Sequence, residues 1–260
     1  MAERTKYPPG TFSWTDLTTT DQDGAKAFYS SLFGWEADDR PAGEGIVYSM
    51  MNVDGKPVAA ISPQPQQQRD MGLPPVWNSY ITVEDADQTA ARAGELGANV
   101  HAAPFDVFDA GRMAVIADPQ GAFFAIWQPN QHIGANLVNG PGLLAWNELH
   151  TPDLDGATSF YTSLFGWTTS DMEMYGMRYR LIGVGDHGNG GLSDSMPPGA
   201  PPHWLVYFGT DDLDGSVAKI SELGGTVVSP PMDIGDGNRI AVGQDPQGGY
   251  FALYAGRFDD

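Results

Sequence analysis

The sequence predicts an α+β fold in which one domain, built from paired βαβββ modules, occurs twice in tandem. The first observation is that DQDGAKAFYSSLFGW at 21–35 returns as DLDGATSFYTSLFGW at 153–167. The second is that RMAVIADPQGAFFAIW at 112–127 returns as RIAVGQDPQGGYFALY at 239–254. The third is that a strand, a helix led by aspartate and a set of strands occur twice within each half, which gives four modules in the chain.

The length and a loop-rich central segment divide the chain into two domains. A chain of 260 residues is long enough for two such units, each large enough to bury its own core. The segment 128–142 is rich in proline, asparagine and glycine, which favours a connection over a helix or strand. We therefore expect a first domain at 1–130, a linker at 131–139 and a second domain at 140–260.

The first module begins with a strand and continues into a helix. FSWTDLTTT at 12–20 alternates apolar and polar character with β-branched residues, as a half-buried strand does. We expect Asp21 to cap the helix and Gly34 to end it, because glycine adopts positive φ without strain. The apolar residues between them fall at helical spacing: Ala25, Phe28, Tyr29 and Leu32.

The second module repeats this order, and the second half of the chain repeats both modules. A strand at 79–83 precedes a helix that begins at Asp85 and ends at Leu96 and Gly97. Strands near 100–105, 111–117 and 122–128 follow, and DPQG forms the hairpin turn. We interpret the repeated FGW and DPQG motifs as scaffold, since FGW stops a helix and DPQG makes a tight turn.

Composition excludes several classes of partner and site. A net charge of −20 repels phosphate backbones and anionic lipid, so we expect neither nucleic acid nor a membrane as a partner. The chain shows no signal-peptide pattern and no apolar run of membrane-spanning length, which predicts a cytoplasmic protein. The absence of cysteine excludes disulfides, thiolate metal sites and cysteine nucleophiles.

The motifs FYSSLFGW and GRMAVIADPQGAFFAIW resemble the vicinal oxygen chelate superfamily, the glyoxalase, bleomycin-resistance and extradiol dioxygenase group. The resemblance covers nearly the whole chain, twice. It implies cupped mixed sheets with helices outside. It does not fix the function, because the family includes metal-dependent lyases, isomerases and dioxygenases as well as metal-free proteins that sequester antibiotics.

Family enzymes place His or Glu at facing strand positions so that three or four side chains converge on one divalent ion. The resemblance locates those positions here at Trp14 and Trp146, at Asn78 and Leu205, and at Ala125 and Ala252. Tryptophan, leucine and alanine cannot ligate a metal, and one asparagine amide is a weak ligand. We therefore expect no metal site, and we keep a divalent metal bound by other residues as the less favoured alternative.

Alternate residues of a strand share a face, so each predicted cup presents a defined set of side chains. Large aromatic residues dominate both sets, which suits a flat, mostly apolar small molecule. The alternative is that these aromatic residues only fill a core. The candidate ligand-binding residues are Trp14, Asp16, Asn78, Tyr80 and Trp127 in the first half, and Trp146, Glu148, His203, Tyr207 and Tyr254 in the second.

The two inward carboxylates, Asp16 and Glu148, imply a partner, a ligand or a solvated pocket, because burying an unpaired charge is costly. Arg112 and Arg239, which stand at equivalent positions, are one choice, and their role would then be structural. In the second half Glu148 and His150 form a candidate catalytic acid–base pair, with His203 nearby. The alternatives are that His150 ends its strand at the surface and that His203 belongs to the proline-rich approach before it.

The other histidines, His101, His132 and His187, lie in separate segments and show no ligand spacing. No glycine-rich phosphate loop is present, so no nucleotide cofactor is implied. The proline-rich connections 63–75 and 195–202 are candidate lids over the two cups, with Met71, Trp77 and Met196 against the ligand.

Two functions therefore remain. The favoured one is a metal-free protein that binds a small hydrophobic or aromatic molecule, in sequestration, in resistance or in an accessory role in secondary metabolism. The alternative is a family enzyme of the lyase, isomerase, cyclase, dioxygenase or hydroxylase type that uses Glu148 and His150 or a divalent metal. Because both units lie in one chain, a monomer can suffice, although a homodimer is also compatible.

Overall fold

A computed structural model describes residues 1–43, 45–174 and 177–258. Each half of the chain forms one eight-stranded mixed sheet, which confirms the predicted α+β class. In spatial order the first sheet consists of β3 (Glu36–Pro41), β4 (Val47–Val53), β5 (Lys56–Pro63), β2 (Phe12–Thr19), β6 (Val76–Thr82), β9 (Phe123–Pro129), β8 (Gly111–Ala117) and β7 (Asn99–Val107). The second consists of β12 (Thr168–Met174), β13 (Met177–Val184), β14 (His187–Ser193), β11 (Leu144–His150), β15 (His203–Gly209), β18 (Tyr250–Ala255), β17 (Asn238–Gln244) and β16 (Thr226–Gly235).

The strand pairing repeats the modular pattern of the sequence. Among the described residues of the first sheet, only β2 with β5 and β6 with β9 pair in parallel. The second sheet repeats this pattern with β11 and β14 and with β15 and β18. The two modules of each half meet in the middle of the sheet, where the leading strands run antiparallel. Asp16 pairs there with Asn78, and Glu148 pairs with Leu205. The candidate site residues therefore stand on the central strands.

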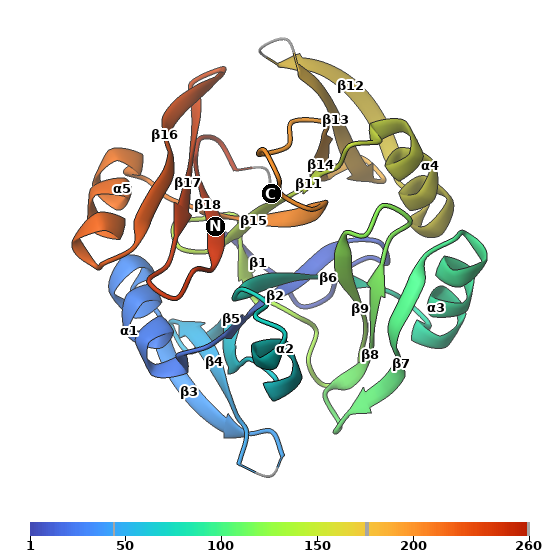
Figure 1. The fold of residues 1–260 in the computed structure, drawn as a ribbon, viewed down its shortest axis with the longest axis horizontal. Coiled ribbons are helices and arrows are strands. Elements are labelled where there is room, and N and C mark those ends of the chain that lie inside the picture. The colour runs from blue at the N-terminus through green and yellow to red at the C-terminus, as the bar shows by residue number, and fades with distance from the viewer. Residues whose placement is uncertain (44, 175–176, 259–260) are drawn as a thin grey trace.

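Helices cover the outside of the strands (Figure 1). The longer ones among the described residues are α1 (Gln22–Phe33), α3 (Ala86–Glu95), α4 (Leu154–Phe165) and α5 (Leu213–Glu222), and a short helix α2 spans Gln66–Asp70. Each of the four begins after an aspartate whose carboxylate accepts a backbone N–H of the first turn, and these caps are Asp21, Asp85, Asp153 and Asp212. Gly34 and Gly166 end α1 and α4 at φ of 75° and 69°, as the FGW motif predicts.

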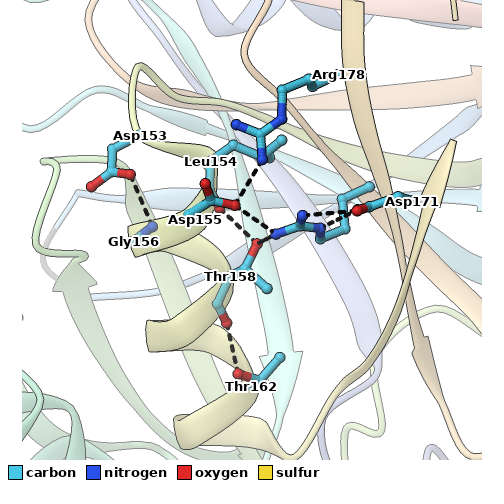
Figure 2. Close-up of polar contacts among 9 residues, drawn as sticks. Asp153, Leu154, Asp155, Gly156, Thr158, Thr162, Asp171 and Arg178 are labelled. Atoms are coloured by element: carbon cyan, nitrogen blue, oxygen red, sulfur yellow. Dashed lines mark hydrogen bonds and ion pairs between the residues drawn. The ribbon is translucent and has the colours of Figure 1, made fainter. Parts of the chain in front are cut away.

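Ion pairs fasten α4 to the edge of the second sheet (Figure 2). Arg178 of β13 donates to Asp155 in the first turn of α4 over 2.8 Å. Arg180 bridges the same carboxylate and Asp171 of β12. These groups are largely exposed apart from Arg180, so solvent screens each pair and its contribution to stability is small. They fix the edge of the sheet and lie away from the central strands.

The FGW motifs join the two halves of the chain. Trp35 donates its indole N–H to the carbonyl of Gly142 over 2.7 Å, and Trp167 donates to Gly10 over 2.8 Å. Both indole rings are buried. The motif therefore ends a helix and also attaches that helix to a segment of the other half.

The DPQG turns make a second connection between the halves. Asp118 accepts three backbone N–H groups of its own turn through one oxygen and the Tyr161 hydroxyl through the other. Asp245 accepts the Tyr29 hydroxyl over 2.9 Å in the same way. Burial raises the pKa of both carboxyl groups. A sequence motif of each half thus binds a helix of the other half.

The hydrophobic cores are shared in the same manner. Residues of α1 pack with Phe208 and Phe251 of the second half, and residues of α4 pack with Phe124 of the first. Figure 1 accordingly shows α1 beside α5 and α3 beside α4. Strand β1 (Ala2–Glu3) pairs with β10 (Leu137–Val138) and so holds the N-terminal segment against the linker. None of the helices in the described ranges is long and apolar enough to cross a membrane.

Candidate functional site

Each sheet directs a tryptophan, a carboxylate and two tyrosines toward one place on its central strands. In the first half, Trp14 and Asp16 of β2 meet Tyr48 of β4 and Tyr80 of β6. In the second half, the residues at equivalent positions are Trp146, Glu148, Tyr179 and Tyr207. We call these two places the first cup and the second cup.

The first cup is closed by a complete hydrogen-bond network. Asp16 is 5% exposed and accepts hydrogen bonds from the Tyr48 hydroxyl at 3.0 Å, the Tyr80 hydroxyl at 2.9 Å and the Asn78 amide at 2.8 Å. The Trp14 indole donates to the Tyr48 hydroxyl in turn. Burial raises the pKa of Asp16, and these three hydrogen bonds oppose that shift. The carboxylate is thus partnered within the protein and needs no ligand.

The linker completes the closure with an imidazole ring. The ring of His132 lies edge-on to Trp14, with 4.5 Å between centroids, and also contacts Trp127. The Trp127 indole donates to the His132 carbonyl over 2.8 Å, which holds the segment in place. Burial, helped by the charge of Arg40, lowers the pKa of His132 to about 4, so the ring is neutral near pH 7. Its Nε2 atom has no hydrogen-bond partner among the described residues.

The second cup, in contrast, contains a cavity of about 520 Å³. The sequence analysis proposed five ligand-binding residues in this half, and four of the five line this cavity. Other residues of the sheet line it as well. The lining from the sheet includes Trp146, Glu148, Tyr179, Leu181, Tyr207, Ile240 and Tyr254. The N-terminal segment contributes Arg4, Lys6, Tyr7 and Pro8, and the C-terminal segment contributes Arg257 and Phe258.

The candidate residues therefore separate into three groups. Those of the first half all lie in the closed cup, and none of them lines the cavity: Trp14, Asp16, Asn78, Tyr80 and Trp127. Those of the second half that line it are Trp146, Glu148, Tyr207 and Tyr254. His150 and His203 do not line the cavity. His150 follows Glu148 by two residues on β11, and His203 of β15 pairs with His150.

Glycines keep the second cup open where the first cup has larger residues. The strand register makes Gly191 equivalent to Ala60, because they pair with Glu148 and Asp16, respectively. A Cβ atom at Gly191 would overlap the Tyr179 hydroxyl, so only glycine fits beside that tyrosine. The sequence signal for this difference is the glycine-rich run of β14.

Three residues earlier in the same strands, Gly188 stands where the first half has Pro57. Gly188 faces the Trp146 ring, and a Cβ atom there would make ordinary contact with it at 3.6 Å. Leu181 replaces the buried Met50 in the neighbouring strand and lines the cavity. Gly188 and Gly191 therefore carry less side-chain volume than Pro57 and Ala60, whereas Leu181 and Met50 are similar in size.

Glu148 and His150 form a hydrogen-bonded pair at the inner end of the cavity. The imidazole Nε2 lies 3.0 Å from Glu148 Oε1, and the two side chains are each 13% exposed. The Nδ1 atom lies 2.6 Å from the carbonyl oxygen of Ser195, which can only accept, so Nδ1 carries a proton. Burial lowers the pKa of His150, but the adjacent Glu148 and the Ser195 carbonyl outweigh it, so the net shift is upward.

His203 lies beside this pair without joining it. The rings of His150 and His203 stack with 5.0 Å between centroids, and His203 Nδ1 bonds the carbonyl of Pro201 over 2.8 Å. Burial and the charge of His150 lower the pKa of His203. The loop 195–202 thus supplies carbonyl oxygens to both imidazoles and lies away from the cavity lining, in contrast to its predicted role as a lid.

Other expectations are corrected by the contacts. Arg112 pairs with Asp87 and Asp106, and Arg239 pairs with Asp214 at the start of α5, so neither neutralises a cup carboxylate. Trp77 does not face the first cup, because its indole donates to Tyr29 in the interface between the halves. A hollow of about 420 Å³ beside Arg239 is open to solvent and belongs to that surface ion pair.

The two cup tyrosines Tyr48 and Tyr179 were missed by the sequence reasoning. Both occupy the same position of the repeat, and each receives an indole N–H from the tryptophan of its cup. Burial, and then the nearby carboxylate, raise the pKa of each well above its usual range. Aligning YSMMNV with YRLIGV would have identified them as a repeated feature.

The donor set does not fit a metal site of the type that the family resemblance implies. At the family positions of the second cup, Trp146, Leu205 and Ala252 offer no ligand atom. Glu148 and His150 bond each other, and the remaining His150 nitrogen is bonded to a carbonyl. Across residues 1–43, 45–174 and 177–258, no three His, Asp or Glu side chains are placed to hold an ion.

Comparisons with known proteins agree with this fold. The chain is 48% identical over 255 residues to "Putative glyoxylase CFP32" of Mycobacterium tuberculosis, covering 97% of each chain. It is 34% identical over 262 residues to "Anthracycline biosynthesis protein DnrV" of Streptomyces peucetius, covering 96% of this chain and 94% of that one.

Solved structures share the architecture at low sequence identity. The Mn(II)-bound glyoxalase from Novosphingobium aromaticivorans superposes with a TM-score of 0.67 at 17% identity, covering 96% of this chain and 84% of that one. The 2,2',3-trihydroxybiphenyl 1,2-dioxygenase of Sphingomonas wittichii strain RW1 gives 0.66 at 15% identity, with coverages of 96% and 92%. The family described as Glyoxalase/Bleomycin resistance protein/Dioxygenase superfamily matches residues 11–126 and 143–253, and the chain belongs to it.

Proposed function

We propose that this protein binds one flat, largely aromatic small molecule in the second cup, and that it does so without a metal. The observation that carries the proposal is the contrast between the two cups. The first is filled by its own side chains and by His132, whereas the second keeps a cavity of about 520 Å³.

The size and lining of the cavity favour an aromatic ligand. Ligand pockets for drug-sized molecules commonly have volumes of about 300–1,000 Å³. Trp146, Tyr207 and Tyr254 supply ring surfaces, and Leu181 and Ile240 supply aliphatic ones. In the first cup, the equivalent tryptophan already contacts a flat ring, that of His132, at 4.5 Å. An aromatic ligand would make the same type of contact with Trp146.

The names of relatives point to the same class of molecule. Two of them, DnrV and DauV from Streptomyces, are called anthracycline biosynthesis proteins. Anthracyclines contain fused flat rings, which the lining of the second cup suits. The proposal for this chain is a binding role toward such a molecule, either in sequestration or as an accessory in secondary metabolism.

Quenching of tryptophan fluorescence by an anthraquinone tests the proposal, because Trp146 lines the cavity. We expect saturable binding with one site per chain. Gly188→Leu would fill the cavity next to Trp146 and should weaken binding at least tenfold. The matched control is Pro57→Leu at the equivalent position of the closed cup, which should leave binding unchanged. Absence of saturable binding by the unmodified protein would refute the proposal.

A second candidate function is metal-independent proton transfer, which the contact between Glu148 and His150 favours. An imidazole and a carboxylate 3.0 Å apart can exchange a proton with a bound molecule. Turnover discriminates the two functions, since a binding protein returns its ligand unchanged after long incubation. Elemental analysis of the purified protein for iron, zinc, nickel and manganese addresses the metal-dependent alternative in the same preparation.

A further inference from the structure

Glu148 has hydrogen-bonding capacity left, and the inference drawn from it rests on the proposed function. Its carboxylate contacts His150 Nε2 at 3.0 Å and, in addition to burial, it raises the pKa of the nearby Tyr179 and Tyr207 hydroxyls. A carboxylate can accept about four hydrogen bonds. Because Glu148 also lines the cavity, a ligand can donate to it.

The closed cup shows which feature of this arrangement is specific to the second cup. Asp16 accepts hydrogen bonds from Tyr48, Tyr80 and the neutral amide of Asn78. At the equivalent positions the second half has Leu205, which donates nothing, and His150 in place of Thr18. A neutral donor has therefore been exchanged for an imidazole that can carry a charge.

The contacts of His150 indicate that this imidazole is charged. Both ring nitrogens face acceptors, the Ser195 carbonyl at 2.6 Å and Glu148 at 3.0 Å, and only the imidazolium donates to both. The positive charge of the ring then lies directly against the carboxylate. Of the other groups nearby, Tyr179 and Tyr207 are neutral because burial raises their pKa, and burial lowers the pKa of His203, which favours its neutral form.

This arrangement restricts the ligand group that can meet Glu148. An anionic group there would be repelled by the carboxylate, and an ammonium group would meet the positive imidazolium beside it, whereas Arg4, Lys6 and Arg257 also line the cavity and can pair an anionic substituent elsewhere on the ligand. A neutral hydroxyl attached to an aromatic ring avoids both penalties at Glu148 and donates a strong hydrogen bond to the carboxylate. We propose that the ligand of the second cup is a hydroxylated aromatic molecule whose phenolic hydroxyl donates to Glu148, with His150 as the positioning residue that holds the carboxylate through its Nε2 contact.

Matched probes test this recognition. 2-Hydroxyanthraquinone and 2-methoxyanthraquinone differ by one methyl group, which removes the ability to donate. Their binding would be measured by tryptophan quenching at about pH 6, below the raised pKa of His150. We expect the hydroxy compound to bind about tenfold or more tightly, as a hydrogen bond to a charged group requires. Glu148→Gln should reduce this preference to about threefold or less. Asp194→Asn, an exposed acid outside the cavity, is the control and should preserve it.

The role of His150 has its own readout. His150→Gln keeps a donor beside Glu148 but removes the positive charge, so it should improve binding of 2-(aminomethyl)anthraquinone, a cation, relative to the hydroxy compound. A merely structural role would weaken both probes together. Circular dichroism and the melting temperature of each variant establish that the fold is retained.

The outcomes separate the inference from the proposed function. If neither anthraquinone binds the unmodified protein, the proposed function fails. If both neutral probes bind equally well, the aromatic site stands and the recognition by Glu148 is overturned. If Glu148→Gln retains the full preference for the hydroxyl, the donor is recognised by another group and the inference is likewise overturned.

Discussion

Single residues decide whether a cup of this fold is open, and His132 is the clearest case. It comes from the linker, outside the repeated motifs, and its ring lies against both Trp14 and Trp127. The folded protein holds this imidazole neutral, since its pKa is lowered to about 4 from 6.5. A group that binds its proton less readily when folded than when unfolded lowers stability as the pH falls.

The first prediction concerns acid stability. As the pH decreases from about 6.5 to about 4, His132 should cost the folded state up to roughly 3 kcal/mol. His132→Phe replaces it with a ring that does not titrate, so the variant should lose less stability than the unmodified protein over this window. Urea unfolding at a series of pH values measures the difference. Parallel curves for the two proteins would show that the imidazole is solvated and does not fill the cup.

The second prediction has the opposite sign, because the pKa of His150 is raised. The pair with Glu148 contributes stability that is fully present below the unfolded pKa of about 6.5 and is lost as the pH rises through the folded pKa. The stability difference between the unmodified protein and His150→Gln should therefore shrink on the alkaline side. The same urea series measures it, and a difference that grows with pH would contradict the assigned charge of His150.

At the scale of the elements, the repeated motifs and the alternation of apolar and polar residues along the strands predict the scaffold well. The aspartate caps, the glycine at the end of α1 and α4, and the common face of Trp14 with Asp16 and of Trp146 with Glu148 all follow from local rules. Openness of a cup does not follow from such rules. It depends on side chains that other segments bring in, such as His132 in the first cup and Tyr7 in the second.

The partners of the cup carboxylates illustrate the same limit. The expectation that Arg112 and Arg239 neutralise them was reasonable by symmetry, but both arginines pair with exposed aspartates. Tyr48 and Tyr80 fill that role in the first cup, and His150 fills it in the second. Tyr48 comes from strand β4, whose place in the sheet is not local information. The DPQG aspartates were correctly interpreted as scaffold, yet their contacts with the other half require the full topology.

The third prediction tests these contacts between a turn and a helix. Tyr161→Phe removes the hydroxyl that donates to Asp118 and accepts the Trp204 indole N–H. The loss leaves buried polar groups without a partner, which costs about 1–3 kcal/mol of unfolding free energy. The exposed Tyr250→Phe is the control, with an expected change within about 0.5 kcal/mol. Chemical denaturation of each variant measures the cost, and equal values for the two variants would refute a bridging role for Tyr161.

At the scale of the whole molecule, the two halves are related in sequence but not independent in structure. Each sheet belongs to one half, whereas the buried clusters and the FGW and DPQG contacts join both. Duplication has also allowed the halves to diverge, since one cup serves the core and the other retains a cavity. This asymmetry is the reason to expect one ligand per chain.

The last prediction follows from that interdependence. If the aromatic cluster around Phe28, Trp35 and Phe208 and its counterpart around Trp167 hold the halves together, neither half can keep its core when the other unfolds. We therefore expect a single cooperative unfolding transition, with coincident midpoints by far-UV circular dichroism and by tryptophan fluorescence. A fragment of residues 1–130 alone should expose apolar surface and aggregate, and coexpression with residues 140–260 should restore a soluble complex. Two separate transitions, or a stable isolated half, would show that the interface contributes little and that the cups can evolve as separate domains.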